Sequence, residues 1–188
     1  MSTHTAHPTP ARRLAALSLA TLTAAGLSTA ALASSAQAAT PTCAGLRATI
    51  VGTDRADDIE GTAGRDVIVA RGGADEIDGR GGDDVICAGS GNDEVEGGRG
   101  ADRIYAGSGH DEVDGDSGAD RIAGSTGNDH LEGGSGNDRL WGGSGHDLLE
   151  GERGSDRLSG GPSTDMVRQG SASDRDEDRW EARYGVDD

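Results

Sequence analysis

Aspartate recurs every nine residues through most of this chain, without one insertion or deletion. Each carboxylate offers hard, charged oxygen atoms, which are the ligands that calcium prefers. Glycine stands two residues before each aspartate, except where Arg55 and Ser163 replace it at the two ends of the array. This spacing indicates cation binding that is repeated along the chain. The thirteen candidate metal ligands are Asp57, Asp66, Asp75, Asp84, Asp93, Asp102, Asp111, Asp120, Asp129, Asp138, Asp147, Asp156 and Asp165.

An aliphatic residue follows each aspartate at a distance of two residues. A short strand with one aliphatic residue at its centre buries only that side chain, because the neighbouring side chains point to the opposite face. Glycines ahead of the aspartate permit positive backbone φ and therefore tight turns. The repeat predicts a turn followed by a strand, with a narrow core. The core positions are Ile50, Ile59, Ile68, Ile77, Ile86, Val95, Ile104, Val113, Ile122, Leu131, Leu140, Leu149, Leu158 and Val167.

A second period, of eighteen residues, separates odd-numbered from even-numbered repeats. The residue after the aspartate is acidic in the first four odd repeats, as at Glu94, but is arginine in the later even ones, as at Arg103. This asymmetry requires positions eighteen apart to stack, which predicts an all-β solenoid of two parallel sheets with two nonapeptides per coil. One outer face is then acidic, and the other is a possible partner face. The possible partner face consists of Arg103, Tyr105, Arg121, Arg139, Trp141 and Arg157.

The run Gly97-Gly98-Arg99-Gly100-Ala101-Asp102-Arg103-Ile104-Tyr105, and the runs beginning at Gly133 and Gly142, resemble the RTX, or hemolysin-type, calcium-binding nonapeptide. The resemblance extends over residues 52–168. It implies a parallel β-roll in which six residues form a turn, three form a strand, and calcium lies between stacked turns. It also assigns the role of calcium ligand to the thirteen aspartates. The gaps between stacked aspartates then give several calcium ions, at most about eleven.

The composition leaves little for an ordinary hydrophobic core. The 188 residues include 33 glycines and no phenylalanine, and aromatic residues make up 2%. Stacked carboxylates repel one another unless a cation lies between them. We therefore expect the metal-free chain to be largely disordered, and calcium binding and folding to be one event.

The first 38 residues are typical of a secretory signal peptide. Arg12 and Arg13 precede an apolar stretch from Leu14 to Leu32, and Ala36-Gln37-Ala38 fits a small-x-small cleavage site. An uncleaved anchor helix is the alternative, which serine and threonine residues in the stretch disfavour. The arginine pair leaves the choice between Sec and Tat export open. We expect a secreted, extracellular protein with no membrane span after signal removal.

The predicted organisation has four parts, which are a signal peptide (1–38), an N-terminal cap (39–51), the β-roll (52–168) and an acidic, aromatic C-terminal cap or tail (169–188). Repeat arrays need atypical ends that cover their last strands. Export places the two cysteines in an oxidising compartment, so a disulfide between Cys43 and Cys87 is expected to fix the N-terminal cap.

Charge and motifs narrow the function. After residue 38, 34 acidic residues against 15 arginines leave 19 negative charges, which disfavours nucleic acid and anionic membranes as partners. Neither a His-Glu-x-x-His zinc signature nor a Gly-x-Ser-x-Gly elbow occurs, so no enzymatic activity is expected. The predicted function is calcium binding coupled to folding. The alternative is a calcium-stabilised surface or matrix module whose arginine and aromatic face binds a protein, a glycan or a second copy, and a merely solvated face is equally compatible with the residues.

Overall fold

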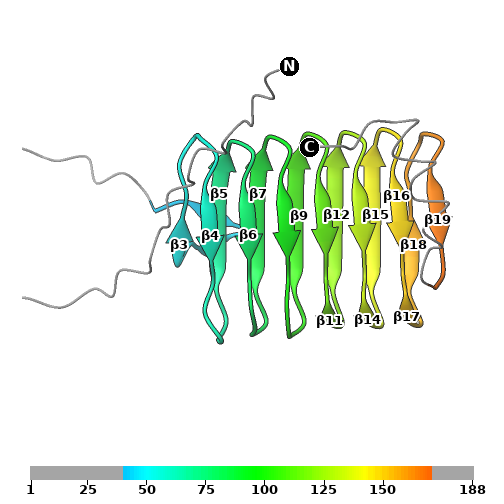
Figure 1. Cartoon of the computed structure of the whole chain (residues 1–188), viewed down its shortest axis with the longest axis horizontal. Helices are drawn as coiled ribbons and strands as arrows, with labels where there is room; N and C mark the ends of the chain where they lie inside the picture. Colours follow the sequence, from blue (N-terminus) through cyan, green and yellow to red (C-terminus); the bar gives the residue numbers. More distant parts are fainter. Residues whose placement is uncertain (1–39, 171–188) are drawn as a thin grey trace, which may run out of the picture.

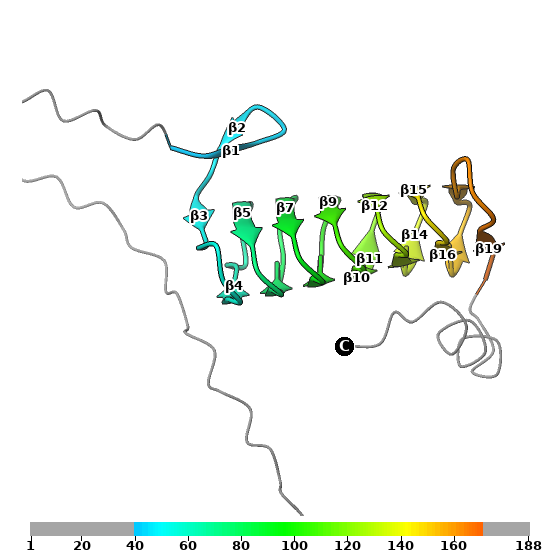
Figure 2. The ribbon, with the colours of Figure 1, turned by 90° about the horizontal axis from the view of Figure 1, so that it is seen from above.

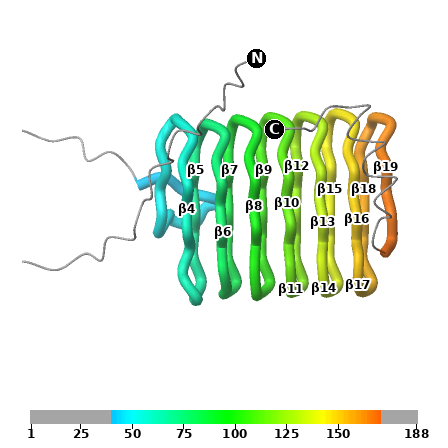
Figure 3. The backbone as a smooth tube through the Cα atoms, viewed as in Figure 1, coloured from blue at the N-terminus to red at the C-terminus, as the bar shows by residue number. Residues whose placement is uncertain are grey.

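A computed structural model describes residues 40–170, which form β-strands joined by tight turns (Figure 1). The strands stack side by side along one axis into a solenoid (Figure 3). Each strand of the two long sheets pairs in parallel with the strand eighteen residues away, so that Ile86 lies between Ile68 and Ile104. The predicted parallel β-roll with two nonapeptides per coil is therefore confirmed.

One of the two long sheets, here called the acidic sheet, consists of seven parallel strands of three residues each. Their centres are the aliphatic residues of the odd-numbered repeats, and their outer positions are mostly acidic. The strands are β4 (Asp58–Glu60), β6 (Glu76–Asp78), β8 (Glu94–Glu96), β10 (Glu112–Asp114), β13 (His130–Glu132), β16 (Leu148–Glu150) and β19 (Met166–Arg168).

The opposite sheet, here called the arginine sheet, also has seven parallel strands. Five of them are six residues long, twice the expected length, because the pairing continues into the following turn. Figure 2 shows the two sheets as separate layers with turns connecting them at both edges. The strands are β3 (Ile50–Val51), β5 (Val67–Gly72), β7 (Val85–Ser90), β9 (Arg103–Ser108), β12 (Arg121–Thr126), β15 (Arg139–Ser144) and β18 (Arg157–Ser159).

A third, smaller sheet joins the turns that lead from the acidic to the arginine sheet in the later coils. Its three parallel strands are β11 (Ser117–Gly118), β14 (Ser135–Gly136) and β17 (Arg153–Gly154).

The core is a single row of aliphatic side chains between the two long sheets. Ile50 and the central residues of the strands up to Leu149 are at most 7% exposed. Two predicted core residues differ, since Leu158 is only partly buried and Val167 is 46% exposed. Both lie in the last strand of their sheet, where no further coil covers them. The longer strands of the arginine sheet add Ala70, Ala88 and Ala106 to the core, which the nine-residue pattern did not predict.

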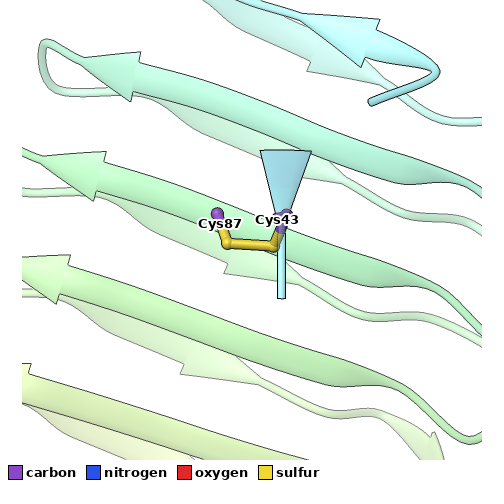
Figure 4. The surroundings of a disulfide bond; sticks show 2 residues. All are labelled: Cys43 and Cys87. Carbon is purple, nitrogen blue, oxygen red and sulfur yellow. A yellow bond between two sulfur atoms is a disulfide. The ribbon is translucent and has the colours of Figure 1, made fainter. Parts of the chain in front are cut away.

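An N-terminal hairpin packs on the outer face of the arginine sheet. Its antiparallel strands are β1 (Thr42–Cys43) and β2 (Leu46–Arg47). Cys43 is buried against Val67 and Val85, and it forms the expected disulfide with Cys87 of β7 at a Cα–Cα distance of 5.8 Å (Figure 4). The disulfide thus joins the hairpin to the third strand of the arginine sheet.

Three of the predicted segments extend outside the described residues, namely the signal peptide (1–38), the start of the N-terminal cap at residue 39, and most of the C-terminal cap or tail (169–188). Within the described residues 40–170, no helix is long and apolar enough to cross a membrane.

Candidate metal centres

The thirteen predicted aspartates form two columns, in which seven precede strands of the acidic sheet and six precede strands of the arginine sheet. In each column, Oδ1 of an aspartate accepts a hydrogen bond from the backbone N–H of the aspartate eighteen residues earlier. The eleven N–O distances range from 2.6 to 3.2 Å. These bonds hold each carboxylate between two stacked turns.

Most of these carboxylates are withdrawn from water. The first eleven aspartates, from Asp57 to Asp147, are at most 5% exposed, whereas Asp156 and Asp165 are only partly buried. A buried ionised carboxylate is costly unless hydrogen bonds or an opposite charge compensate for its lost hydration. The columns therefore require compensation on both carboxylate oxygens.

The second oxygen, Oδ2, has no hydrogen-bond partner in nine of the eleven buried aspartates. Buried polar atoms are almost always paired in folded proteins, so nine equivalent exceptions require one common explanation. A cation between the turns satisfies hard carboxylate oxygens without further donors, and the donor set of carboxylates and turn carbonyls suits calcium. The nine residues are Asp75, Asp84, Asp93, Asp102, Asp111, Asp120, Asp129, Asp138 and Asp147.

In the first coil, threonine donors satisfy Oδ2 in place of a cation. Oδ2 of Asp57 accepts hydrogen bonds from the backbone N–H of Thr53 at 2.6 Å and from its hydroxyl at 2.9 Å. Oδ2 of Asp66 accepts the equivalent pair from Thr62, both at 2.8 Å. Oδ2 of these two aspartates is thus satisfied by protein donors alone, which the sequence analysis did not predict.

The backbone explains why only these two turns close in this way. The residue four positions before the aspartate has positive φ in the eleven later turns, as at Arg71 (φ 86°) and Gly98 (φ 90°). Thr53 and Thr62 hold the same position without positive φ, since β-branched residues avoid that region. The threonine N–H can then bond to the aspartate of its own turn.

The last aspartate of each column also differs from the nine central ones in the surroundings of its carboxylate. Oδ2 of Asp156 accepts a hydrogen bond from the Nε2 group of Gln169. Asp165 lies in the turn where Pro162 and Ser163 break the repeat consensus, and its side chain remains partly exposed. The geometry therefore separates nine central aspartates from two at each end.

Burial raises the pKa of all nine aspartates whose Oδ2 lacks a partner. Desolvation is the largest cause in each, and the backbone hydrogen bond to Oδ1 opposes it. The pKa of Asp75, Asp84 and Asp102 rises to about 6, that of Asp111 and Asp120 to about 7. For Asp129, the fifth of seven aspartates in its column, the pKa reaches about 8. The columns thus favour either a proton or a cation at these carboxylates near neutral pH.

Glycine two residues before the aspartate allows the stacked turns to approach closely. A Cβ atom on Gly109 would lie 1.7 Å from the carbonyl oxygen of Gly91 in the turn below, and Gly109 itself has φ of 142°. Only glycine fits both the contact and the backbone angle. The turn carbonyls are therefore brought next to the aspartate columns.

Polar side chains directly before the aspartates form another column, which the sequence analysis did not predict. His110 donates its backbone N–H to Oδ1 of Asn92, and its Nδ1 accepts the N–H of Asn128. The backbone N–H of His146 in turn donates a hydrogen bond to Oδ1 of Asn128. Side chains at this position therefore satisfy the backbone of the neighbouring turn, which favours residues with a hydrogen-bond acceptor there.

The residues of the possible partner face lie together on the outer surface of the arginine sheet. Arg103, Arg121, Arg139 and Arg157 are exposed and stack in register at the starts of four successive strands. None of the four makes an ion pair with another described residue. Tyr105 and Trp141, two strands apart on the same face, are 40% and 55% exposed.

Comparison with curated proteins gives no significant match. The model of one protein family, the RTX calcium-binding nonapeptide repeat, matches residues 51–86, 88–122, 114–149 and 141–174. The matched stretches cover most of the described residues and include both aspartate columns. The repeat, the stacked turns and the oxygen donors agree with this match, and the chain therefore belongs to the RTX calcium-binding nonapeptide repeat family.

Proposed function

We propose that the chain is a secreted protein whose roll folds as it binds nine calcium ions between its stacked turns. The observation that carries this proposal is the set of nine buried Oδ2 atoms without a hydrogen-bond partner. A carboxylate that is buried and ionised opposes folding, whereas the same carboxylate beside a divalent cation favours it. The function assigned is binding rather than catalysis.

The number of ions follows from the N-terminal end of each column. Thirteen aspartates in two columns leave eleven gaps between neighbours. In the first gap of each column, Asp57 and Asp66 use Oδ2 to accept hydrogen bonds from threonine. Nine gaps remain, and the lower-numbered aspartate of each has an Oδ2 without a partner. We therefore expect nine ions rather than eleven.

Each ion would be held by aspartate carboxylates and by carbonyl oxygens of the glycine-rich turns. Calcium supplies two positive charges that compensate for the desolvated carboxylates. The chain holds one carboxylate oxygen with a backbone N–H and leaves the other for the ion. Sites of this oxygen-rich kind in extracellular proteins have dissociation constants of about 10⁻⁴ to 10⁻³ M, which matches extracellular rather than intracellular calcium.

Two features support secretion. Residues 1–38 have the composition of a signal peptide and a small-x-small cleavage site. The Cys43–Cys87 disulfide is of a kind that persists in oxidising compartments. Secretion is tested by measuring the mass of the protein recovered from culture medium. The mass should correspond to a chain that begins near residue 39.

The folding proposal is tested by titrating the metal-depleted mature protein with calcium and with magnesium. Without calcium, we expect a radius of gyration of roughly 40 Å, as for an unfolded chain of this length, and below about 20 Å with calcium. Far-UV circular dichroism should follow the same midpoint, and native mass spectrometry should count nine ions. A metal-depleted chain that is already compact and melts cooperatively would contradict the proposal.

A second candidate function is binding of a polyanionic partner through the possible partner face. Four in-register arginines without ion pairs among the described residues, beside exposed Tyr105 and Trp141, favour it, since arginine and aromatic residues are enriched in interfaces. Dextran sulfate should bind the calcium-loaded protein, and neutral dextran should not. Substitution of Arg121 and Arg139 by glutamine should weaken that binding without changing the calcium count.

A further inference from the structure

A cluster of metal-binding side chains lies outside the aspartate columns, on the outer face of the acidic sheet. His130 and Glu132 lie two residues apart on β13 and therefore point to the same face. Glu150 of β16 pairs in register with Glu132. One ligand atom from each of the three side chains lies within 4.8 Å of the other two.

The cluster differs from the rest of the acidic face in both burial and chemistry. The positions in register with His130 in the preceding coils are acidic, as at Glu94 and Glu112, and are partly or fully exposed. His130 is only 7% exposed, and Glu150 only 1%. Leu148, which pairs with His130 in the next strand, is fully buried. An imidazole thus joins two carboxylates where little water is present.

The ligand types and their separation suit zinc better than calcium. Nε2 of His130 lies 3.3 Å from Oε1 of Glu132. Two ligands bound to one tetrahedral zinc ion at about 2.0–2.1 Å lie roughly 3.3 Å apart. Imidazole nitrogen is a preferred ligand of zinc, whereas calcium and magnesium take oxygen. We propose that His130, Glu132 and Glu150 bind one Zn²⁺ ion, independently of the calcium columns.

Arg168 competes with this ion. Its NH1 group lies 3.5 Å from Oε1 of Glu150, and the two residues pair in register on β16 and β19. The guanidinium compensates for the buried carboxylate when no metal is bound. Zinc binding requires this ion pair to open, so the arginine lowers zinc affinity. Removal of its charge should therefore strengthen binding.

The experiment uses the full mature protein at saturating calcium, so that the columns are filled. Isothermal titration with Zn²⁺ measures stoichiometry and affinity, and Co²⁺ in place of zinc gives visible absorption that reports a nitrogen-containing tetrahedral site. We expect one ion per chain. His130→Gln and Glu150→Gln should each lower zinc affinity by at least tenfold, and Arg168→Gln should raise it several-fold.

His110→Gln is the matched control, since His110 is an exposed turn residue on the edge of the roll. This variant should keep wild-type zinc affinity. Circular dichroism and calcium count show for each variant whether the roll is intact, which separates a failure of this site from a failure of the calcium proposal. Wild-type zinc binding in His130→Gln, or no stoichiometric zinc binding in either the wild type or Arg168→Gln, overturns the proposal.

Discussion

Each aspartate in the columns uses its two oxygens for different purposes. Oδ1 is fixed by a backbone N–H of the neighbouring turn, as between Asp129 and Asp111. Oδ2 is buried without a protein donor in the nine central residues. The hydrogen bond determines where the carboxylate lies, and the second oxygen determines which ligand it needs. Asparagine keeps the first property and loses the second, so it separates the two roles.

Asp129→Asn should reduce the number of bound calcium ions by at least one. The amide retains Oδ1 as an acceptor for the N–H of Asp111 but removes the charge that attracts the ion. Loss of one charged contact should cost the calcium-loaded roll about 1–3 kcal/mol, measured by urea unfolding. Native mass spectrometry counts the ions. Asp66→Asn is the control, because threonine donors satisfy Asp66; equal ion loss in both variants would contradict the assignment.

Acidification should partly replace calcium. The pKa values of Asp75, Asp120 and Asp129 rise from 3.8 to about 6, 7 and 8 in the roll. The folded chain therefore binds protons more tightly than the unfolded chain. The resulting stabilisation is complete below pH 3.8 and is lost as the pH rises through 6 to 8. Metal-depleted protein should show more β-structure by circular dichroism at pH 5 than at pH 8. Less structure at pH 5 would be incompatible with these shifts.

At the scale of the turn, glycine determines how closely the coils stack. Gly109→Ala should destabilise the calcium-loaded roll by at least about 3 kcal/mol, because its Cβ meets the Gly91 carbonyl at 1.7 Å and its φ is 142°. Gly64 holds the equivalent position in the first coil, where a Cβ meets nothing within 4 Å. Gly64→Ala should change the free energy of unfolding by less than about 0.5 kcal/mol. Urea denaturation compares the two, and similar losses would show that close stacking is not the cause.

The strands and columns could be predicted from sequence because one repeat unit encodes them. The contrast between Glu94 and Arg103 at equivalent positions required an eighteen-residue coil, and the register confirms it. The predicted disulfide between Cys43 and Cys87 is also present. The strands and columns depend on spacing, and the disulfide on the presence of two cysteines behind a signal-like segment, and both are visible in a single sequence.

The remaining features depend on departures from the repeat. Thr53 and Thr62 occupy a position that varies throughout the array, so their bonds to the aspartates became evident only from the turn backbone. Ala70 joins the core because the pairing of β5 continues into the turn. Val167 has the expected residue type but lies in the last strand, where nothing further stacks on it. The contacts made at the ends of the array and at its variable positions can therefore be found only from the three-dimensional structure.

For the whole molecule, the nine calcium ions that we propose would nearly balance the charge. The residues after position 38 carry 19 negative charges at neutral pH with histidine neutral, and nine calcium ions would supply 18 positive ones. The proposed ions would lie along both edges of the roll, so this compensation would act along its length. The first coil is the exception, since threonine donors satisfy Oδ2 of its aspartates. The disulfide-linked hairpin also packs on the neighbouring strands of the arginine sheet, through Cys43, Val67 and Val85. We therefore expect the N-terminal end to be the part of the roll that depends least on calcium.

This difference between the ends can be removed by substitution. Thr53→Gly combined with Thr62→Gly eliminates both hydroxyl donors and allows positive φ at the position where all eleven later turns have it. The first coil should then resemble the later ones, with Oδ2 of Asp57 and Asp66 available to an ion. Native mass spectrometry should count eleven calcium ions instead of nine. In metal-depleted protein, the variant should be no more ordered than the wild type.

Thr126→Gly is the control, because Thr126 ends β12, where the chain enters a turn, and its hydroxyl donates to the Gly107 carbonyl and not to an aspartate. It should leave the count at nine. If the double variant still binds nine ions, the threonine bonds are not what excludes calcium from the first coil. If it binds eleven, the free energy that threonine supplies at the N-terminal end is interchangeable with that of a calcium ion, because both satisfy the same buried oxygen.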